Sequence, residues 1–373
     1  MTRTSQQVCL CMMVRDEAHV IERALRSAFG IADFFVVLDT GSTDDTIMLV
    51  RAALAGRPHK VIESTWKGFT GSRDEALAMA RPHGQYIVFL DADDFFVGNV
   101  ALAKQRLSHS TAWVCFAFQH WLRHAKLFAV HRDLDVAWAG QRHEFLASPK
   151  QHHAPLFALM TDISIRYTHE GYRSRDPHTW LNDADEIATE RLQKIETVDA
   201  AHARTLFYLA RTLQMQGDLG RAEDTFIKRS KYAGADEEER WFAELCSIRL
   251  LELRTPDDLM LPQKYAELLL ARDTRAEVYL DLARQLRMRG QFVEALELAR
   301  QATRIKIPED WIDVDTGAHS VFAWDEQAAN LLELKRYAEA SILWRRALCF
   351  GSLHYADRSR MREAIAVCDT HKF

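Results

Sequence analysis

The sequence predicts two fold classes in one chain: an α/β unit with a mostly parallel sheet, followed by an all-α unit of repeated helix pairs. Apolar runs of strand length alternate with helical patterns over about the first 90 residues. Two carboxylates, Asp91 and Asp93, directly follow one of these runs. After about residue 175 the strand pattern ends, and small residues recur at fixed offsets in helical segments. We therefore predict domains at residues 1–176 and 177–373.

The α/β unit begins with a strand, a helix and a second strand. Residues 8–14 form an apolar run that is long enough for a buried strand and too short for a helix. Apolar residues recur at helical spacing over residues 20–28, and Gly30 is expected to stop this helix. Residues 34–38 predict the second strand, which leads directly into Asp39.

The pattern continues with two more helices and two more strands. Ser42 is expected to cap a helix that carries Asp44 and Asp45 in its first turn, where carboxylates complement the helix dipole. The remaining predicted elements are a strand at 61–64, a helix at 73–80 and a strand at 86–90. Strands that alternate with helices in this way predict a doubly wound sheet.

Acidic residues follow two of these strands. Asp39 and Asp91 lie where strands end, and α/β sheets bind their ligands at the carboxyl ends of strands. A hard divalent cation that is shared with substrate phosphates needs oxygen ligands such as these. A surface turn with acidic residues is the alternative. No GxGxxG follows the first strand and no GxxxxGK[ST] occurs, which argues against dinucleotide and P-loop sites.

Four segments carry a family resemblance, in the order MMVRDEAHVIERALRS, VVLDTGSTDDT, GSRDEALAMA and IVFLDADDFF. Together they resemble the nucleotide-sugar-binding half of a GT-A-fold family 2 glycosyltransferase. The resemblance is strong over residues 6–100 and weak over residues 101–175. It implies a Rossmann-like GT-A domain, a UDP-sugar donor and a Mn²⁺ or Mg²⁺ cofactor.

The resemblance also implies roles for individual residues. Asp39 would hydrogen-bond the uracil or the ribose, and Arg73 would contact the base or neutralise phosphate. In the run Asp91-Ala92-Asp93, the first carboxylate would reach the ribose and the last would bind the metal on the diphosphate. A turn carboxylate is the alternative for Asp39, and a surface helix charge is the alternative for Arg73. Chemically, such a metal stabilises the negative charge that builds on the leaving diphosphate.

The loop after the first strand would wrap the nucleotide. It contains Val14, Arg15, Asp16 and Glu17, in a segment where similar sequences more often read Lys-Asn-Glu-Glu. The alternative for the two acidic residues is that they complement the dipole of the following helix.

The segment at 126–146 contains the candidates for the catalytic base. In similar sequences a strand–turn segment here ends in His-Glu, which matches Glu144 and the histidine before it. An inverting transferase needs one general base to take the acceptor proton. Glu144 is the first candidate, with Asp133 and Asp135 behind it. The alternative for Glu144 is a structural ion pair.

A further segment, residues 165–172, resembles the part of these enzymes that closes the active site. Its His169 is either a third metal ligand, because imidazole suits Mn²⁺, or a histidine that packs against the strand. HExxH is absent, so the sequence does not indicate a zinc protease.

The second half resembles tetratricopeptide (TPR) helix pairs. Small and large residues take the same offsets in segments 206–226, 278–302 and 322–347, and a degenerate unit lies around 241–253. We interpret residues 305–320 as an insertion and residues 178–197 as a connecting helix. The apolar stripe of these helices is expected to be core.

Composition limits the function classes. The net charge of −5 over 373 residues argues against nucleic-acid binding, which needs a basic surface. No apolar segment is long enough to span a membrane, and the first residues lack a signal-peptide pattern. Six scattered cysteines without CxxC pairs predict reduced thiols in a cytoplasmic protein.

These observations favour a metal-dependent inverting glycosyltransferase that moves a sugar from a UDP-sugar to a glycan or a peptide or protein acceptor. Helical repeats often hold extended peptides, so the second half is expected to bind the acceptor or a protein partner, or to self-associate. The alternative is a non-catalytic TPR-type scaffold with a degenerate nucleotide-sugar-binding domain.

Overall fold

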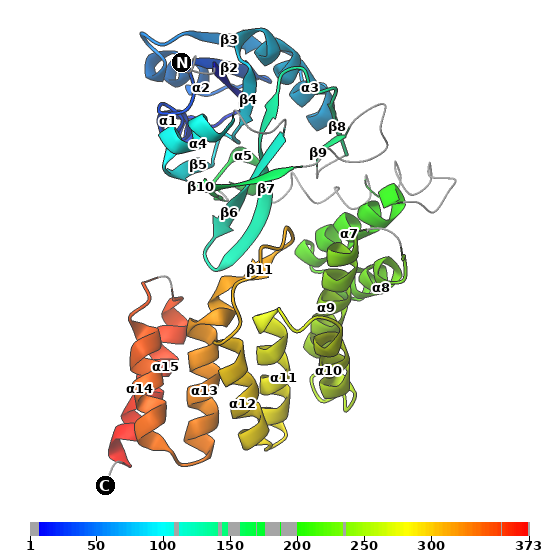
Figure 1. Ribbon diagram of the computed structural model, residues 1–373, viewed down its shortest axis with the longest axis vertical. Helices are drawn as coiled ribbons and strands as arrows, with labels where there is room; N and C mark the ends of the chain where they lie inside the picture. The colour runs from blue at the N-terminus through cyan, green and yellow to red at the C-terminus, as the bar shows by residue number, and fades with distance from the viewer. Residues whose placement is uncertain are drawn as a thin grey trace. The chain divides into compact units, whose positions relative to one another are not determined.

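The computed structural model forms two compact units (Figure 1). It describes residues 7–107, 112–140, 144–147, 157–168, 170–175, 187, 200–233, 236–351 and 353–371. The N-terminal unit contains Met1–Gln119 and His124–Thr189, and the C-terminal unit contains His120–Arg123 and Glu190–Phe373. The predicted boundary at 176/177 and the predicted helix at 178–197 lie outside the described residues, Ile187 excepted, and stay predictions.

The N-terminal unit is built on a mixed, mostly parallel sheet in the order β3-β2-β1-β4-β7-β6-β10-β5. Strand β1 lies parallel to β2 and β4, whereas β7 and β5 run antiparallel to their partners β4 and β10. The strands are β1 Val8–Val14, β2 Phe34–Asp39, β3 His59–Glu63, β4 Tyr86–Phe89, β5 Phe95–Gly98, β6 Ala112–Gln119, β7 Leu122–His131 and β10 Ala158–Arg166. The predicted α/β class is confirmed.

Helices cover both faces of this sheet, which explains why its strands are almost continuously apolar. Because side chains alternate along a strand, Leu10 and Met12 of β1 pack into one core cluster and Cys9 and Cys11 pack into another. The first cluster is completed by α1 Ile21–Ser27, α2 Thr46–Ala53 and α4 Val100–Arg106, and the second by α3 Gly68–Ala80.

The predicted cap of the second helix was wrong. Helix α2 begins at Thr46, and neither Asp44 nor Asp45 lies in its first turn. The hydroxyl of Ser42 instead donates to the carboxylate of Asp39 and accepts the N–H of Asp16 at 2.9 Å. A contact with a distant loop has therefore replaced the local cap.

Strand register brings three loops together at one edge of the sheet. Val14 at the end of β1 pairs with Asp39 at the end of β2, and Cys11 pairs with Phe89 at the end of β4. The segments after β1, β2 and β4 therefore follow neighbouring strand ends. The same unit also contains a small two-stranded sheet, β8 Ala137–Ala139 and β9 Phe145–Ala147, whose strand β8 contacts α3.

The C-terminal unit consists of successive helix pairs, as predicted. Buried alanines such as Ala222, Ala283 and Ala340 let neighbouring helices pack closely. The connecting turns place Gly217, Gly290 and Lys335 in the left-handed region, at φ of +81°, +78° and +59°. The helices are α7 Ala200–Met215, α8 Leu219–Ser230, α9 Glu237–Arg254, α10 Leu261–Ala271, α11 Ala276–Met288, α12 Phe292–Ala302, α13 Val321–Glu333, α14 Tyr337–Leu348 and α15 Tyr355–Thr370.

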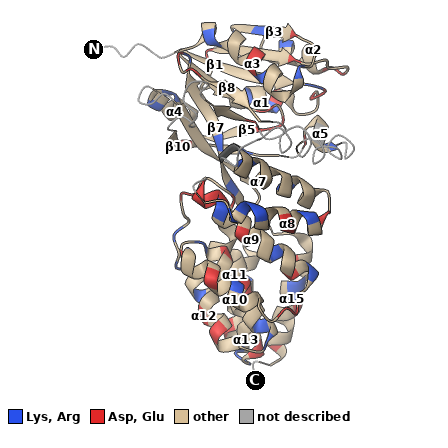
Figure 2. Cartoon of the chain, turned by 90° about the vertical axis from the view of Figure 1, so that its right-hand side faces the viewer, with Lys and Arg blue, Asp and Glu red and all other residues tan. Residues whose placement is uncertain are grey.

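The segment predicted as an insertion packs into this unit. It contains β11 Val314–Asp315 and a 3₁₀ turn at Thr316–His319. The fully buried Arg275 donates to Asp310 at 2.9 Å, and Arg211 pairs with Asp313 at 2.8 Å. Basic and acidic residues alternate along the helices of this unit (Figure 2), which is consistent with such pairing. None of the described helices has both the length and the apolar character that a membrane crossing requires.

Candidate functional site

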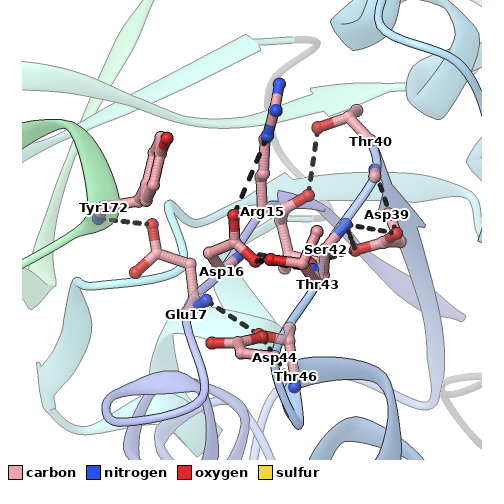
Figure 3. A network of polar contacts seen from close by, with 12 residues as sticks. Arg15, Asp16, Glu17, Asp39, Thr40, Ser42, Thr43, Asp44, Thr46 and Tyr172 are labelled. Carbon is pink, nitrogen blue, oxygen red and sulfur yellow. Dashed lines mark hydrogen bonds and ion pairs between the residues drawn. The ribbon is translucent and has the colours of Figure 1, made fainter. Parts of the chain in front are cut away.

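The loops after β1 and β2 are tied to each other by hydrogen bonds (Figure 3). Asp16 has a positive φ of +53°, and its carboxylate accepts the N–H of Thr43 at 2.6 Å. The buried carboxylate of Asp39 accepts the N–H groups of Gly41 and Ser42, each at 3.0 Å. Asp39 and Asp16 therefore fix the shape of both loops and bring them together.

Glu17 extends this network from the loop after β1 to the segment at residue 172. Its backbone N–H donates to Thr46 Oγ1 at 2.8 Å, and its Oε1 accepts the N–H of Tyr172 at 3.0 Å. Its other oxygen is buried and accepts no hydrogen bond from the described residues. Burial raises the pKa of Glu17 to about 7, and the nearby carboxylate of Asp93 contributes to this increase. Glu17 is therefore a half-buried acid with one buried oxygen that is available for a further interaction.

Asp91 is held between two cations. Arg73 on α3 donates to Oδ1 at 3.0 Å, and Lys126 on β7 donates to Oδ2 at 2.7 Å. Burial raises the pKa of Asp91, but Lys126 and Arg73 together lower it by more, so the pKa lies well below its ordinary value. Asp91 is therefore held as a carboxylate in a defined orientation.

Asp93 and Asp94 are bound to the segment after β10. The N–H of Gly171 donates to Asp93 Oδ2 at 3.0 Å, and the N–H of Thr168 donates to Asp94 Oδ1 at 3.1 Å. Burial raises the pKa of both acids, to about 6 for Asp94. Lys126 contacts the second carboxylate oxygen of Asp94.

Residues 170–175, here called the closing segment, bind both the loop after β1 and the loop after β4. Arg175 donates to the backbone oxygen of Asp16 at 3.0 Å, while Gly171 and Tyr172 bind Asp93 and Glu17. A Cβ atom on Gly171 would lie 2.9 Å from Asp93 Oδ2 and 3.2 Å from Glu17 Oε1. The absence of a side chain at position 171 therefore lets these two carboxylates approach the same turn.

The donor set at this turn suits a hard divalent cation. Glu17 and Asp93 supply carboxylate oxygens, and one buried oxygen of Glu17 accepts no hydrogen bond from the described residues. The described part of the chain contains no cluster of three or more histidine, cysteine or acidic side chains arranged for a metal. His169, predicted as a possible third ligand, lies outside the described residues.

The candidate bases occupy different environments. Glu144 lies beside Arg73, with 3.5 Å between Oε2 and Nε, and its side chain is only 9% exposed. The guanidinium of Arg73 also stacks over the ring of Trp138 on β8, 5.0 Å from its centroid. Asp133 and Asp135, by contrast, are exposed. The structure thus brings Glu144, but neither aspartate, to the Arg73–Asp91 pair.

The sequence did not lead us to predict Lys126 or Asp94 as residues of the site. A lysine directly before the apolar residues 127–130 of the same strand was the available signal for Lys126, because an ammonium group that enters a core needs a carboxylate partner. Asp94 directly follows the run Asp91-Ala92-Asp93 and was assigned no role, yet it is fully buried. Of the remaining predicted positions, Val14 is the buried last residue of β1. Arg15 and Ala92 lie on the loops after β1 and β4, and Arg15 approaches Asp16 at 3.9 Å.

Comparison with protein families identifies one domain. Residues 9–106 match the family model described as "Glycosyl transferase family 2". This range includes the strands β1 to β4 and the residues from Arg15 to Asp94 that form most of the site. The predicted resemblance of the N-terminal unit is confirmed.

Three curated relatives match different lengths of the chain. A "TPR repeat-containing protein" of Synechococcus elongatus is 27% identical over 313 residues, which are 79% of this chain and 75% of that protein. The "Succinoglycan biosynthesis protein ExoU" of Rhizobium meliloti is 38% identical over 93 residues, 24% of this chain and 27% of that protein. An "Uncharacterized glycosyltransferase" of Rickettsia bellii is 30% identical over 90 residues, 24% of this chain and 29% of that protein. The chain therefore combines a family 2 glycosyltransferase domain with TPR-like repeats.

Proposed function

We propose that this protein is a metal-dependent, inverting glycosyltransferase that transfers a sugar from a UDP-sugar to a glycan or to a peptide or protein. One observation carries the proposal: within the matched family 2 domain, Asp39 ends β2 and Asp91 and Asp93 follow β4, and these two strands flank β1. The carboxyl edge of such a sheet is the usual ligand site of α/β folds.

In this proposal the donor nucleotide binds across the loops after β1 and β2. The loop Val14–Glu17 wraps it, and Asp39 accepts a hydrogen bond from the uracil or the ribose. Asp91 accepts a hydrogen bond from a ribose hydroxyl, because Arg73 and Lys126 hold it as a carboxylate. The fixed orientation of both aspartates supports this role, since preorganised acceptors lose little entropy on binding.

Asp93 would hold a Mn²⁺ or Mg²⁺ ion, with Glu17 beside it. Such an ion, when bound, stabilises the negative charge on the departing diphosphate. The two half-buried carboxylates at Gly171, one of which has a buried oxygen that accepts no hydrogen bond from the described residues, support this assignment. The closing segment, which binds both carboxylates, would exclude water from the same place.

Glu144 would be the general base that takes the acceptor proton. It is the candidate carboxylate that lies against the Arg73–Asp91 pair, and Trp138 covers the same guanidinium. A base within hydrogen-bond distance of the acceptor is the requirement of an inverting displacement.

The test is a donor screen that measures nucleotide release. Sugar nucleotides that carry UDP, GDP or CDP are each incubated with the full chain, with Mn²⁺, with Mg²⁺ or with a chelator. The proposal expects release of UDP, dependent on the metal, and tighter binding of UDP than of GDP in a calorimetric titration. Failure to bind any of the nucleotides, with or without metal, would contradict it.

A non-catalytic scaffold is the second candidate. It is favoured by the observation that Asp91 and Asp93 are already bonded within the chain, and by the relative that matches most of the chain and is named for its repeats. A scaffold with a degenerate site would bind UDP weakly or not at all and would show no metal-dependent nucleotide release, so the same screen separates the two candidates.

A further inference from the structure

A half-buried lysine lies at the centre of the acidic cluster. Lys126 is on β7, and the antiparallel register that pairs Ala129 with Val88 places it, when extended, across from Asp91. Its ammonium bonds to Asp91 Oδ2 at 2.7 Å and contacts Asp94, and it lies 5.0 Å from the centroid of the Tyr167 ring. The loop after β4 and the segment after β10 therefore both contact this ammonium group.

Without this lysine, the orientation of the Asp91 carboxylate would not be fixed. Arg73 occupies only Oδ1, so a carboxylate with a free Oδ2 could rotate about its Cβ–Cγ bond. Lys126 occupies Oδ2 and thereby fixes the plane of the carboxylate, leaving its remaining lone pairs in a defined direction. Charge-assisted bonds of this kind are shorter and stronger than neutral ones.

Asp94 anchors the lysine from the other side. It is fully buried, and the N–H of Thr168 holds its Oδ1 at 3.1 Å while its Oδ2 contacts Lys126. Three carboxylates within the run 91–94 would repel one another in a buried site. Lys126 and Arg73 supply two positive charges against them, and the remaining negative charge at Asp93 suits a divalent cation.

We propose that Lys126 is a positioning residue of the donor site, which orients Asp91 toward the ribose and leaves Asp93 as the carboxylate available to the metal. The assignment rests on the proposed function, because it names how that same site holds its nucleotide. Lys126 acts through Asp91 and does not itself touch the nucleotide.

The chain offers a matched control. Lys104 on α4 pairs with Asp33 at 2.5 Å, and its side chain is 21% exposed against 22% for Lys126. Asp33 precedes β2, so this pair lies at the opposite end of the strand from Asp39. Lys104→Met and Lys126→Met therefore each remove an ion-paired lysine of similar side-chain exposure, one remote from the site and one within it.

The test is calorimetric titration of the full chain with UDP in the presence of Mn²⁺. Lys126→Met is expected to weaken UDP binding about 10–100-fold, the usual cost of removing a group that orients a ligand residue. Lys104→Met is expected to bind UDP as the wild type does. Equal UDP affinity in both lysine variants and the wild type would overturn the inference and leave the proposed function standing. A wild type that binds no UDP would overturn both.

A double-mutant cycle separates positioning from general structural damage. If Lys126 acts through Asp91, then Lys126→Met adds little to the loss of UDP affinity already caused by Asp91→Asn. Additive losses would contradict the inference. The pair Lys126→Met with Asp94→Asn removes both buried charges, so it is expected to recover melting temperature without recovering UDP affinity. Recovery of both together would show that Lys126 is only structural.

Discussion

At the scale of single residues, the proposed reaction depends most on the charge of Asp93. Asp93→Asn keeps the shape of the side chain and an oxygen that can still accept the N–H of Gly171. We expect turnover to fall at least about a hundredfold with little change in melting temperature, because charge stabilisation of the leaving group is lost. Nucleotide release, measured over a range of Mn²⁺ concentrations, checks this. Near-normal metal-dependent release would remove Asp93 from the role.

Glu144 is the second residue whose role can be isolated. Glu144→Gln is expected to leave UDP binding almost unchanged and to slow transfer by roughly 10²–10⁴-fold, because the acceptor proton loses its base. The exposed residues Asp133 and Asp135 provide controls, and their amide variants should transfer at nearly the wild-type rate. If Glu144→Gln instead loses UDP affinity at normal turnover, its contact with Arg73 serves donor binding.

At the scale of elements, the backbone conformation of the turns between paired helices predicts how substitutions there change the free energy of unfolding. Gly217 and Gly290 take the left-handed conformation without strain, but Lys335 adopts it at φ +59° with a Cβ atom. Lys335→Gly is therefore expected to raise the free energy of unfolding by roughly 0.5–1 kcal/mol, and Gly290→Ala to lower it by a similar amount. Thermal and urea unfolding check both changes. A loss of stability in Lys335→Gly would show that its side chain contributes more than its backbone costs.

One acid in the insertion at residues 305–320 makes the free energy of unfolding depend on pH. Burial, followed by the negative charge of Glu277, raises the pKa of Asp315 to about 6. Stability linked to this group is full below the unfolded pKa of about 4 and is lost as the pH rises through about 6. Asp315→Asn retains an oxygen that can accept the N–H groups of Gly317 and Ala318. It is expected to raise the free energy of unfolding at pH 7 by on the order of 1–3 kcal/mol, and to change it little at pH 4.

Unfolding by urea at pH 4, 5, 6 and 7 measures this effect. Asp257→Asn, at an exposed position of the same unit, is the control for the change in net charge. The same pH profile in Asp315→Asn and in the wild type would assign the pH dependence to other groups.

Local patterns predicted the elements better than the contacts between them. Strand β1 was predicted at its observed bounds because a strand buried on both faces is apolar at nearly every position. The cap by Ser42 was predicted wrongly because its hydroxyl binds the carboxylate of Asp39 and the N–H of Asp16, and the second of these lies 26 residues away. Lys126 was missed for the same reason, since Asp91 lies 35 residues away and only the antiparallel pairing of β4 with β7 brings them together.

At the scale of the whole molecule, the two units are predicted to divide the function. A fragment that ends near residue 176 should keep UDP affinity, because Asp39, Asp91, Asp93 and the closing segment all lie within it. It should not transfer to the natural acceptor, since the repeat helices that we expect to bind the acceptor are missing. Its melting temperature is expected to fall, because residues 120–123 belong to the C-terminal unit and lose their packing. Full transfer by this fragment would contradict the division.

The position of β10 in the sheet has a consequence for synthesis on the ribosome. Strand β5 is made early, and its one partner among the described strands is β10, which begins 60 residues after β5 ends; the closing segment comes later still. At roughly 5–20 residues per second, β5 waits roughly 3–12 s for its partner. During that interval the nascent chain exposes an unpaired strand edge, which is a site for misassociation. Translation speed through residues 99–158 is therefore expected to influence the yield of folded protein.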